Sequence, residues 1–341
     1  MSISFLPDES WNNFIESLMK LYPVIAPVAV ENKFSFLTIK STDEIRLDYD
    51  ITILSPKKVF FPPRQDLFKF ENNTYETLLK TETKILLGVH PHDIKAISMT
   101  DKLFARNYKD NNYLDQRNKT YIIGSNVQTF YKHAFFGSVS QEVKVEGHDI
   151  FLTKLNDGFL FEVLTEKGRT LAKHAKLIDA SENQKIEAKE IDQTALDNCP
   201  ETLEYTSDEI KSKMDSEYDN NEKWDMLSYD CFSCGSCNIV CPTCNCYDVQ
   251  DEWNEDGIGG VRYRKWDGCL TCEFAEVSVQ GGTENFRAKT ADRFKHRMMK
   301  KTSYLNEFFE GPACVGCGRC TGACTADIAN PVKIIKSIMN K

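Results

Sequence analysis

The chain of 341 residues is 41% hydrophobic and 27% charged, and its formal net charge is −9. This length is enough for two or three domains with a sizeable core. Nucleic acid is excluded as a partner, because binding phosphates needs a basic face and this chain is acidic. The sequence shows no secretory signal and no apolar run of about 18 residues. We therefore expect a cytoplasmic protein without a membrane span.

The predicted elements indicate an α+β protein in three parts. Residues 1–178 are expected to form a mixed α/β domain. Residues 179–222 are rich in Glu, Asp, Lys and Ser, which favours an acidic linker or a solvated helical arm. Residues 223–341 are expected to form an α-helical, ferredoxin-like dicluster domain, with helices over residues 289–305 and 331–339.

Helices and strands alternate in the first part. The apolar spacing of residues 8–21 predicts a helix with Asp8 or Ser10 as its N-cap. Strands are predicted over residues 34–39, 58–61, 84–89 and 120–123. A helix over residues 93–104 joins the last two strands into a parallel β-α-β unit. A hairpin is predicted with strands over residues 149–155 and 159–164 and its turn at Asn156-Asp157-Gly158. A further helix is predicted over residues 166–175.

Two runs of cysteines share the spacing C-x2-C-x2-C-x3-C, with a glycine after the second cysteine of each. The runs are Cys231, Cys234, Cys237 and Cys241, followed by Pro242, and Cys314, Cys317, Cys320 and Cys324, followed by Thr325. This spacing binds [4Fe–4S] clusters, and the fourth cysteine of a run ligates the other cluster in two-cluster proteins. The predicted ligands are therefore Cys231, Cys234, Cys237 and Cys324 for the first cluster, and Cys314, Cys317, Cys320 and Cys241 for the second.

Two other interpretations of these runs fit less well. Structural zinc sites use C-x2-C pairs or mixed Cys and His ligands, and not a repeated run of four cysteines. A disulfide framework is typical of small secreted domains, whereas every cysteine except Cys199 lies between Cys231 and Cys324. Cys199 is expected to be a free thiol.

Four further cysteines occur in two close pairs. Cys244 and Cys246 follow the first run directly, and Cys269 and Cys272 form a C-x2-C pair. Together they could hold a third [4Fe–4S] cluster or a zinc ion, and we expect a third metal site there. The alternative is that some of them are buried apolar thiols.

A basic stretch and a pair of histidines contain chemically active side chains, but neither feature indicates one particular function. Basic side chains concentrate in one stretch: Arg287, Lys289, Arg293, Lys295, His296, Arg297, Lys300 and Lys301. They could offset the negative charge of thiolate-ligated clusters, dock an acidic partner, or form a solvated helix face. His90 and His92 open the predicted β-α turn, where such a pair is more often a turn element with satisfied hydrogen bonds than a ligand or a proton donor.

The order of these motifs resembles one family. The pattern C-x2-C-G-x-C-x3-C-P-T-C-x-C is similar to that of the iron–sulfur subunit shared by two redox complexes, anaerobic sulfite reductase and cytoplasmic NiFe sulfhydrogenase, and known in the latter as the beta subunit. The matching segments are Cys231–Tyr247, Trp266–Cys269, Gly281-Gly282 with Arg287, and Cys314–Cys320, with looser matches over Phe61–Phe68 and Gly88–Ala96. The resemblance thus covers most of the chain.

This resemblance implies an electron-transfer subunit without catalytic residues. In the family, a flavin and [2Fe–2S] subunit oxidises NAD(P)H, and the present type of subunit relays single electrons to or from a catalytic subunit. The implied catalytic partner is a sirohaem sulfite reductase or a NiFe hydrogenase. A relay needs no acid, base or nucleophile, and the sequence offers no convincing catalytic triad or phosphate loop.

Two departures from the family pattern concern the third site. His92 stands where the family usually has cysteine, and residues 121–138 lack the cysteines often found there. Cys272 is not a usual family cysteine, so we predict that it supplies the fourth ligand of the third site, with His92 as the alternative. A rival to the relay is a stand-alone reductase that acts on a disulfide at this site. A structural zinc scaffold is the third interpretation.

Overall fold

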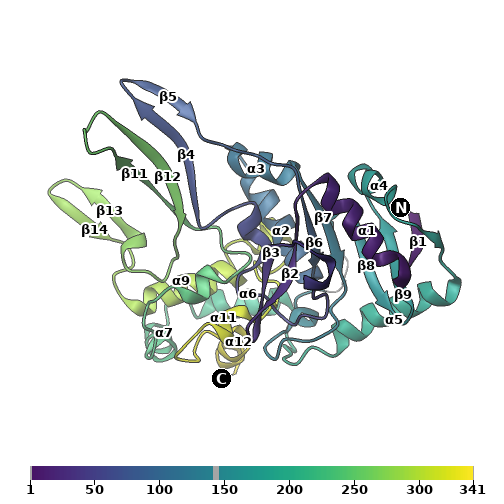
Figure 1. Ribbon diagram of the computed structural model, residues 1–341. Helices are drawn as coiled ribbons and strands as arrows, with labels where there is room; N and C mark the ends of the chain where they lie inside the picture. Colours follow the sequence, from purple (N-terminus) through teal and green to yellow (C-terminus); the bar gives the residue numbers. More distant parts are fainter. Residues whose placement is uncertain (1, 141–145, 341) are drawn as a thin grey trace. The chain divides into compact units, whose positions relative to one another are not determined.

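The computed structural model describes residues 2–140 and 146–340 (Figure 1). Its contacts divide the chain into two compact units, and each unit is built from three separate segments of the sequence. The first unit contains Met1–Pro56, Thr81–Pro200 and Val315–Cys317, and the second contains Lys57–Lys80, Glu201–Cys314 and Gly318–Lys341. Nothing in the sequence indicated that the segment 57–80 belongs with the cysteine-rich half. Across the described residues, every helix is too short or too polar to cross a lipid bilayer.

An eight-stranded sheet forms the centre of the first unit, in the order β10-β1-β9-β8-β7-β6-β2-β3. The strands are β1 (Ser2–Pro7), β2 (Val24–Val30), β3 (Lys33–Thr38), β6 (Lys84–Val89), β7 (Thr120–Ser125), β8 (Ile150–Leu155), β9 (Gly158–Val163) and β10 (Ile178–Asp179). The middle strands β2, β6, β7 and β8 are parallel neighbours, and antiparallel pairs complete both edges. The predicted parallel β-α-β unit is therefore confirmed.

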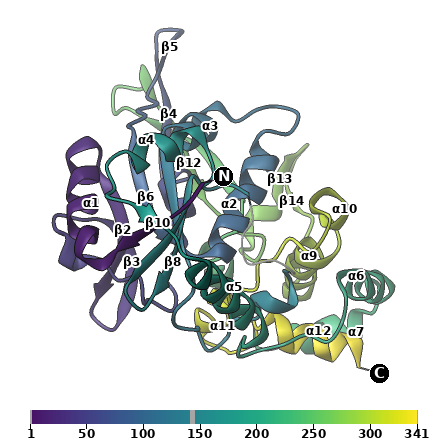
Figure 2. The ribbon, with the colours of Figure 1, turned by 90° about the vertical axis from the view of Figure 1, so that its right-hand side faces the viewer.

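Helices cover both faces of this sheet. They are α1 (Asp8–Leu21), α2 (Pro91–Phe104), α3 (Asn111–Asn118), α4 (Glu166–Ala172) and α5 (Glu182–Asp197). Figure 2 shows α1 on one side of the sheet and α2 on the other. On its inner face α1 buries Phe14, whose ring centroid lies 5.6 Å from that of Phe161 on β9. On the other face Ile94 of α2 packs so closely that a Cβ at Gly124 would lie 2.7 Å from its Cδ1.

Several elements predicted within residues 1–178 have the expected bounds, and two details are wrong. The helix over residues 8–21 and the hairpin β8–β9 form as predicted, because their apolar patterns match the faces that they bury. The N-cap of α1 is Pro7, without a side-chain hydrogen bond, and not Asp8 or Ser10. The strand predicted over residues 58–61 is wrong, because Pro56–Val59 form a 3₁₀ turn.

The second unit combines two small β-sheets with seven helices in the part of the chain that the structure describes. A four-stranded sheet has the order β11-β12-β4-β5, and β13 pairs with β14. The strands are β4 (Arg64–Glu71), β5 (Thr74–Thr77), β11 (Tyr247–Trp253), β12 (Gly259–Trp266), β13 (Glu276–Val279) and β14 (Gly282–Asn285). The helices are α6 (Ser207–Ser216), α7 (Asn221–Ser228), α8 (Ser236–Ile239), α9 (Thr290–Thr302), α10 (Asn306–Phe309), α11 (Arg319–Gly322) and α12 (Pro331–Met339).

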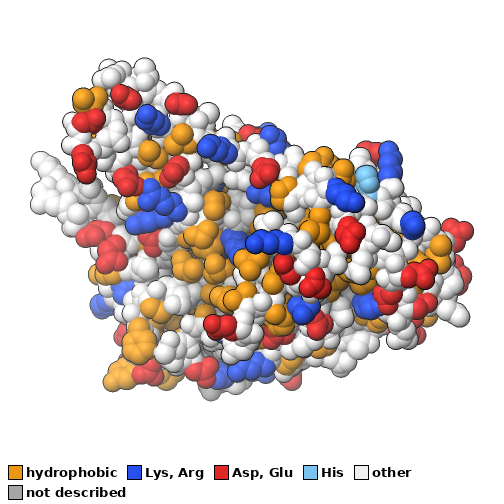
Figure 3. Space-filling view, viewed as in Figure 1, with side chains coloured by type: hydrophobic (Ala, Val, Ile, Leu, Met, Phe, Trp, Pro, Cys, Tyr) orange, Lys and Arg blue, Asp and Glu red, His pale blue; other side chains and the backbone are white. Residues whose placement is uncertain are grey.

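The cysteine-rich unit is less helical than the sequence indicated. Helices form close to the predicted ranges 289–305 and 331–339, but the gap between the two cysteine runs also holds both hairpins. Their turns contain Gly257 and Gly281-Gly282, all with positive φ angles, which is typical of tight turns. Figure 3 shows acidic and basic side chains interspersed over the four-stranded sheet, and one such pair is Arg262 with Asp251 (2.6 Å).

Packing of α1 on the sheet allows a direct test. Leu18 is fully buried in the core of the first unit, so Leu18→Ala should destabilise the protein by about 2–5 kcal/mol through lost burial and a cavity. Urea denaturation followed by circular dichroism should show a lower transition midpoint. The control is Glu16→Ala on the exposed side of the same helix, and equal midpoints for the two variants would contradict this packing.

Candidate metal centres

The two cysteine runs fold alike. In each run the glycine after the second cysteine, Gly235 or Gly318, has a left-handed backbone with a φ of 72° or 75° and precedes a one-turn helix. A residue with a Cβ is strained in that conformation. The two short helices, α8 and α11, pack against each other. The repeat in the sequence is therefore also a repeat in the structure.

The four thiols of the first predicted set lie near one another. Cys231 interacts electrostatically with Cys324 and Cys234. Cys237 interacts with Cys320 of the second predicted set and with Cys231 and Cys324 of its own. Burial raises the pKa of the Cys237 thiol to about 12, and the nearby Arg297 opposes that shift. Such a thiol ionises only when a metal or another positive charge stabilises the thiolate. The proximity agrees with the predicted set, whose role as ligands stays a prediction.

Three thiols of the second predicted set belong to the second unit. Cys320 interacts with Cys241 of the other run, and Lys301 is attracted to both Cys241 and Cys314. Burial raises the pKa of Cys320, and Arg297 opposes this. The fourth cysteine of each run therefore lies beside thiols of the other run, as the crossing rule for two-cluster proteins predicts.

The fourth thiol of that set, Cys317, closes a short segment counted with the first unit. In this segment the Gly316 carbonyl accepts a hydrogen bond from the Phe135 amide, with N and O 2.8 Å apart. A Cβ at Gly316 would lie 2.5 Å from the Phe136 backbone. The close approach of the two backbones therefore requires glycine between the first two cysteines of the second run.

Three of the five remaining cysteines also gather together. Cys244 and Cys246 share a hydrogen bond that lowers the pKa of Cys244 and raises the pKa of Cys246. The buried Asn238 places its Nδ2 3.6 Å from the sulfur of Cys244 and 3.3 Å from that of Cys269. Lys300 Nζ lies 3.3 Å from Cys246 Sγ. The neutral Asn238 amide donates hydrogen bonds and Lys300 supplies a positive charge, and both favour the thiolate form of these sulfurs.

The other two cysteines have different surroundings. Cys272 is exposed, with its sulfur 3.7 Å from Asn285 Nδ2 and 3.8 Å from Arg293 Nη1. Its role as fourth ligand of the third site stays a prediction. Cys199 is buried in the first unit, where its sulfur accepts a hydrogen bond from the Gly137 amide at 3.2 Å. It forms no disulfide with another cysteine of the described residues, and its assignment as a free thiol stays a prediction.

The two histidines of the β-α turn are buried among aromatic rings. His90 stacks on Tyr49 with ring centroids 3.9 Å apart, and His92 stacks on Phe136 at 5.5 Å. His92 Nε2 also lies 3.8 Å from a carboxylate oxygen of Asp93. These contacts support a structural role for the pair at the start of α2, and a ligand role for His92 stays a prediction.

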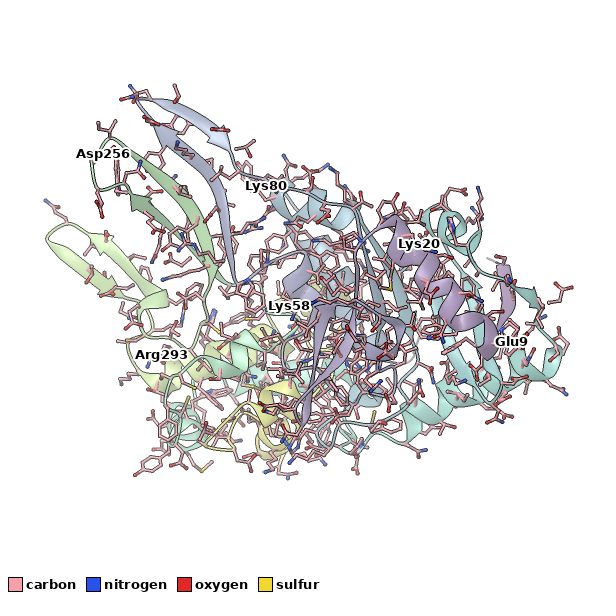
Figure 4. All side chains as sticks on the ribbon, viewed as in Figure 1. Glu9, Lys20, Lys58, Lys80, Asp256 and Arg293 are labelled. Atoms are coloured by element: carbon pink, nitrogen blue, oxygen red, sulfur yellow. The ribbon has the colours of Figure 1, made fainter. Side chains whose placement is uncertain are left out.

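Helix α9 directs a row of cations toward the cysteines. Arg293, labelled in Figure 4, Arg297 and Lys301 follow one another at helical spacing and are only 4%, 2% and 7% exposed. Burial by itself would lower the pKa of Arg297. Attraction to four thiols outweighs burial and raises the pKa above its ordinary value: Cys237, Cys320, Cys241 and Cys269. The burial of these three residues excludes a solvated helix face for them and favours charge compensation of the metal centres.

A fourth buried cation comes from the N-terminal half of the sequence. Lys57 is 4% exposed and donates from Nζ to the carbonyls of Cys241 (2.9 Å) and Cys244 (2.8 Å). Burial lowers its pKa, while the nearby thiols raise it. The sequence did not single out Lys57, which directly precedes the strand predicted over residues 58–61. The one available signal was the neighbouring family-like segment that begins at Phe61.

The surroundings of Arg297 fit an anionic cluster. Its Nε has no hydrogen-bond partner among the residues that the structure describes, and a buried donor left without an acceptor is unfavourable. The sulfur atoms of a thiolate-ligated cluster would supply both acceptors and negative charge beside this guanidinium. In the same described ranges, no group of three or more His, Cys, Asp or Glu side chains could hold a metal ion. The thiolates of a cubane sit at separate corners, so they stand farther apart than the ligands of one ion.

These features define an iron–sulfur protein of the dicluster type. Residues 230–328 match the family model of the 4Fe-4S dicluster domain. The chain is also 32% identical over 338 residues to the sulfhydrogenase 2 subunit beta of Pyrococcus furiosus, which covers 98% of this chain and 97% of that protein. The chain belongs to the family of sulfhydrogenase beta subunits, and it is an iron–sulfur electron-transfer subunit with [4Fe–4S] clusters. No solved structure is significantly similar to it.

The contacts of Lys57 predict a loss of metal in one variant. Lys57→Ala removes the donor of two carbonyls, a loss of about 1–3 kcal/mol for each, and also a cation beside the thiols. We expect fewer iron and sulfide atoms per chain after anaerobic purification, measured by colorimetric assay. Lys69→Ala, at an exposed side chain of β4 in the same segment, is the control. Wild-type iron content in Lys57→Ala would show that these hydrogen bonds do not support the metal loops.

Proposed function

We propose that this chain relays single electrons through two [4Fe–4S] clusters. Their ligands would be Cys231, Cys234, Cys237 and Cys324 for the first, and Cys314, Cys317, Cys320 and Cys241 for the second. The observation that carries the proposal is the proximity of thiols from the two runs: Cys237 lies near Cys320 and Cys324, and Cys320 lies near Cys241. This crossing is typical of two-cluster ferredoxins. When bound, the clusters supply reversible one-electron storage.

The residues of the chain prepare these sites for electron exchange. Cys237 and Cys320 are buried, so the protein and not bulk water sets the charge environment of the ligands. Helices α8 and α11 hold the two loops in fixed positions against each other. The buried cations of α9 compensate the thiolates. These roles need no proton transfer and no nucleophile, which agrees with a relay.

A third [4Fe–4S] cluster is proposed at Cys244, Cys246, Cys269 and Cys272. Support comes from the first three of these thiols: Asn238 contacts both Cys244 and Cys269. Cys246 hydrogen-bonds Cys244 and contacts Lys300. Cys272 lies beside Arg293, a contact suited to a thiolate. Zinc at the same ligands and His92 as the fourth ligand are the alternatives.

The proposed partners come from the family. We propose that the chain works in a complex, between a flavin and [2Fe–2S] subunit that oxidises NAD(P)H and a catalytic subunit. The relative that matches across 98% of this chain is a sulfhydrogenase subunit. This similarity favours a NiFe hydrogenase over a sirohaem sulfite reductase as the catalytic partner. Affinity purification from the native source tests this choice, because a nickel protein or a sirohaem protein would accompany the chain.

Metal content and spectroscopy test the cluster assignment. Anaerobically purified chain should hold about eight iron atoms for two clusters or about twelve for three. Cys272→Ser should lower the iron by about four atoms and remove one signal from the electron paramagnetic resonance (EPR) spectrum of the reduced protein. Cys199→Ser, at the free thiol of the first unit, should leave both unchanged. An unaltered spectrum in Cys272→Ser would contradict its role as a ligand, and His92→Ala would then test the alternative.

A relay and a stand-alone reductase differ in whether the isolated chain reduces a disulfide substrate. The purified, reduced chain should not reduce a small disulfide such as oxidised glutathione, because the relay offers electrons to a protein partner only. Sustained thiol production, abolished by Cys246→Ser, would favour the stand-alone reductase. A colourless protein with zinc and no iron would contradict both and support the zinc scaffold.

A further inference from the structure

Two exposed cysteines of the second unit lie close to each other. Among the thirteen cysteines of the chain, Cys234 of the first set and Cys272 of the third set are the exposed ones. Their loops are in contact, because a Cβ at Gly235 would lie 3.1 Å from Thr271 Cγ2. With the clusters proposed above, on which this inference rests, the first and third centres therefore reach the surface at one place.

The buried guanidinium of Arg293 ties these two loops together. Its Nη2 donates to Ser233 Oγ at 2.9 Å in one loop, and its Nε donates to the Leu270 carbonyl at 3.0 Å in the other. Its Nη1 donates to the carbonyls of Arg287 (2.8 Å) and Ala288 (2.6 Å). The segment that follows β14 is therefore held against both cysteine loops.

Large apolar side chains lie exposed around the two loops. Met226 on α7 and Tyr229 at its end are one helical turn apart, on the side opposite the buried Trp224. Phe232 lies between the first two cysteines of the first run, and Phe286 directly precedes the carbonyls bound by the guanidinium. Apart from the tryptophan, these side chains are 63–87% exposed. Exposed apolar side chains gathered in one area are typical of an interaction site.

The hairpin of β13 and β14 begins beside one of these loops and lacks packing of its own. Every residue from Glu276 to Glu284 is exposed, and Figure 1 shows the hairpin extending away from α9. At its base, Asn285 Nδ2 donates to the Cys272 carbonyl at 2.7 Å. A two-stranded hairpin alone is marginally stable in water. A partner that packs against the hairpin would stabilise it.

The charge around the two loops indicates which partner fits. Within residues 221–236 and 270–289, the exposed charged side chains are carboxylates with Lys289 as the cation. A protein with Lys and Arg on its own surface would be attracted here, and an acidic protein would be repelled. The carboxylates are Glu222, Asp225, Asp230, Glu273, Glu276 and Glu284.

We propose that these residues form one docking surface, through which the chain exchanges electrons with a redox protein of basic surface. The docking surface comprises Met226, Tyr229, Phe232, Phe286 and the hairpin β13–β14. The partner carries apolar side chains beside its cofactor and a rim of Lys and Arg. Apolar contact excludes water and holds the two cofactors close, and the opposite charges steer the encounter. Each transfer moves one electron between a cluster and the partner's cofactor, so that one is oxidised and the other reduced.

The probe for this surface is mitochondrial cytochrome c, a lysine-rich protein with an exposed haem edge. The anaerobically purified full chain is reduced with dithionite, freed of excess reductant and mixed with ferricytochrome c, and haem reduction is followed by stopped-flow absorbance. The rate should fall as ionic strength rises, because salt screens the attraction. Isothermal titration of the oxidised chain with ferricytochrome c measures binding separately, since no electron moves between them.

The acidic part of the docking surface is tested by Asp230→Lys. Haem reduction should slow by about tenfold at low salt, because the reversed charge weakens steering. Binding should weaken in the same solution, and both losses should shrink at high salt. Glu255→Lys makes the same change in net charge at an exposed position between β11 and β12, and it should leave rate and binding close to wild type. Equal losses in the two variants would overturn the proposal, since net charge alone would explain them.

The apolar part is tested by Tyr229→Ser, which lies outside the cysteine runs. Binding and haem reduction should weaken by about tenfold at low and high salt alike, because an aromatic contact inside an interface does not depend on salt. Tyr75→Ser is the matched control, because it removes another exposed tyrosine, on β5. Loss of binding in Tyr75→Ser as large as in Tyr229→Ser would place the interface elsewhere and contradict the proposal.

Each remaining outcome also decides the proposal. Iron-replete Asp230→Lys and Tyr229→Ser proteins with wild-type rates and binding overturn it. Tighter binding of the wild-type chain to flavodoxin, an acidic flavoprotein, than to cytochrome c would overturn the basic partner. If one variant loses iron, the other carries the test. A wild-type chain without iron would contradict the proposed function itself, which separates that failure from a failure of this inference.

Discussion

The second unit depends on buried positive charge beside clustered thiols. Arg297, Lys301 and Lys57 are each less than 10% exposed, and removing the partner of a buried charge typically destabilises a protein by about 3–5 kcal/mol. Their strongest favourable charge partners are the cysteine sulfurs. The cations therefore favour ionised, metal-bound thiolates over neutral thiols, and metal binding and the stability of these loops become one equilibrium.

The elements that the sequence predicted well are those with purely local causes. The helix over residues 8–21 needs only its own apolar stripe, and the hairpin at residues 156–158 needs only its turn residues. The two cysteine runs belong to the same class, because the spacing and the glycines Gly235 and Gly318 already dictate the loop that wraps a cluster. Each of these features can be recognised within about a dozen residues, without knowledge of what packs against it.

Features that depend on contacts between residues far apart in the chain could not be predicted from the sequence. A row of Arg and Lys on a helix has the same pattern whether it faces water or buried thiols, so the role of α9 depends on loops that lie far from it in the chain. Lys57 is a sharper case, since its two acceptors are carbonyls of Cys241 and Cys244. Carbonyls are present in every residue and carry no sequence signal. Counting cysteines likewise could not reveal that Cys272 is exposed while Cys244, Cys246 and Cys269 gather around Asn238 and Lys300.

The second unit as a whole also depends on contacts between distant parts of the sequence, because it includes the segment 57–80. Strand β4 of that segment pairs with β12 along its length, and Arg264 on β12 donates to Gln65 at 2.8 Å in the buried part of the pair. Trp266 at the end of β12 then donates to the carbonyl of Phe61 at 3.0 Å and lies under Lys57. The hairpin between the cysteine runs is thus tied to the residues that support the Cys241–Cys244 loop. The sequence family model starts at residue 230, but the physical unit that holds the metal loops includes a strand pair and a lysine that precede it by more than a hundred residues.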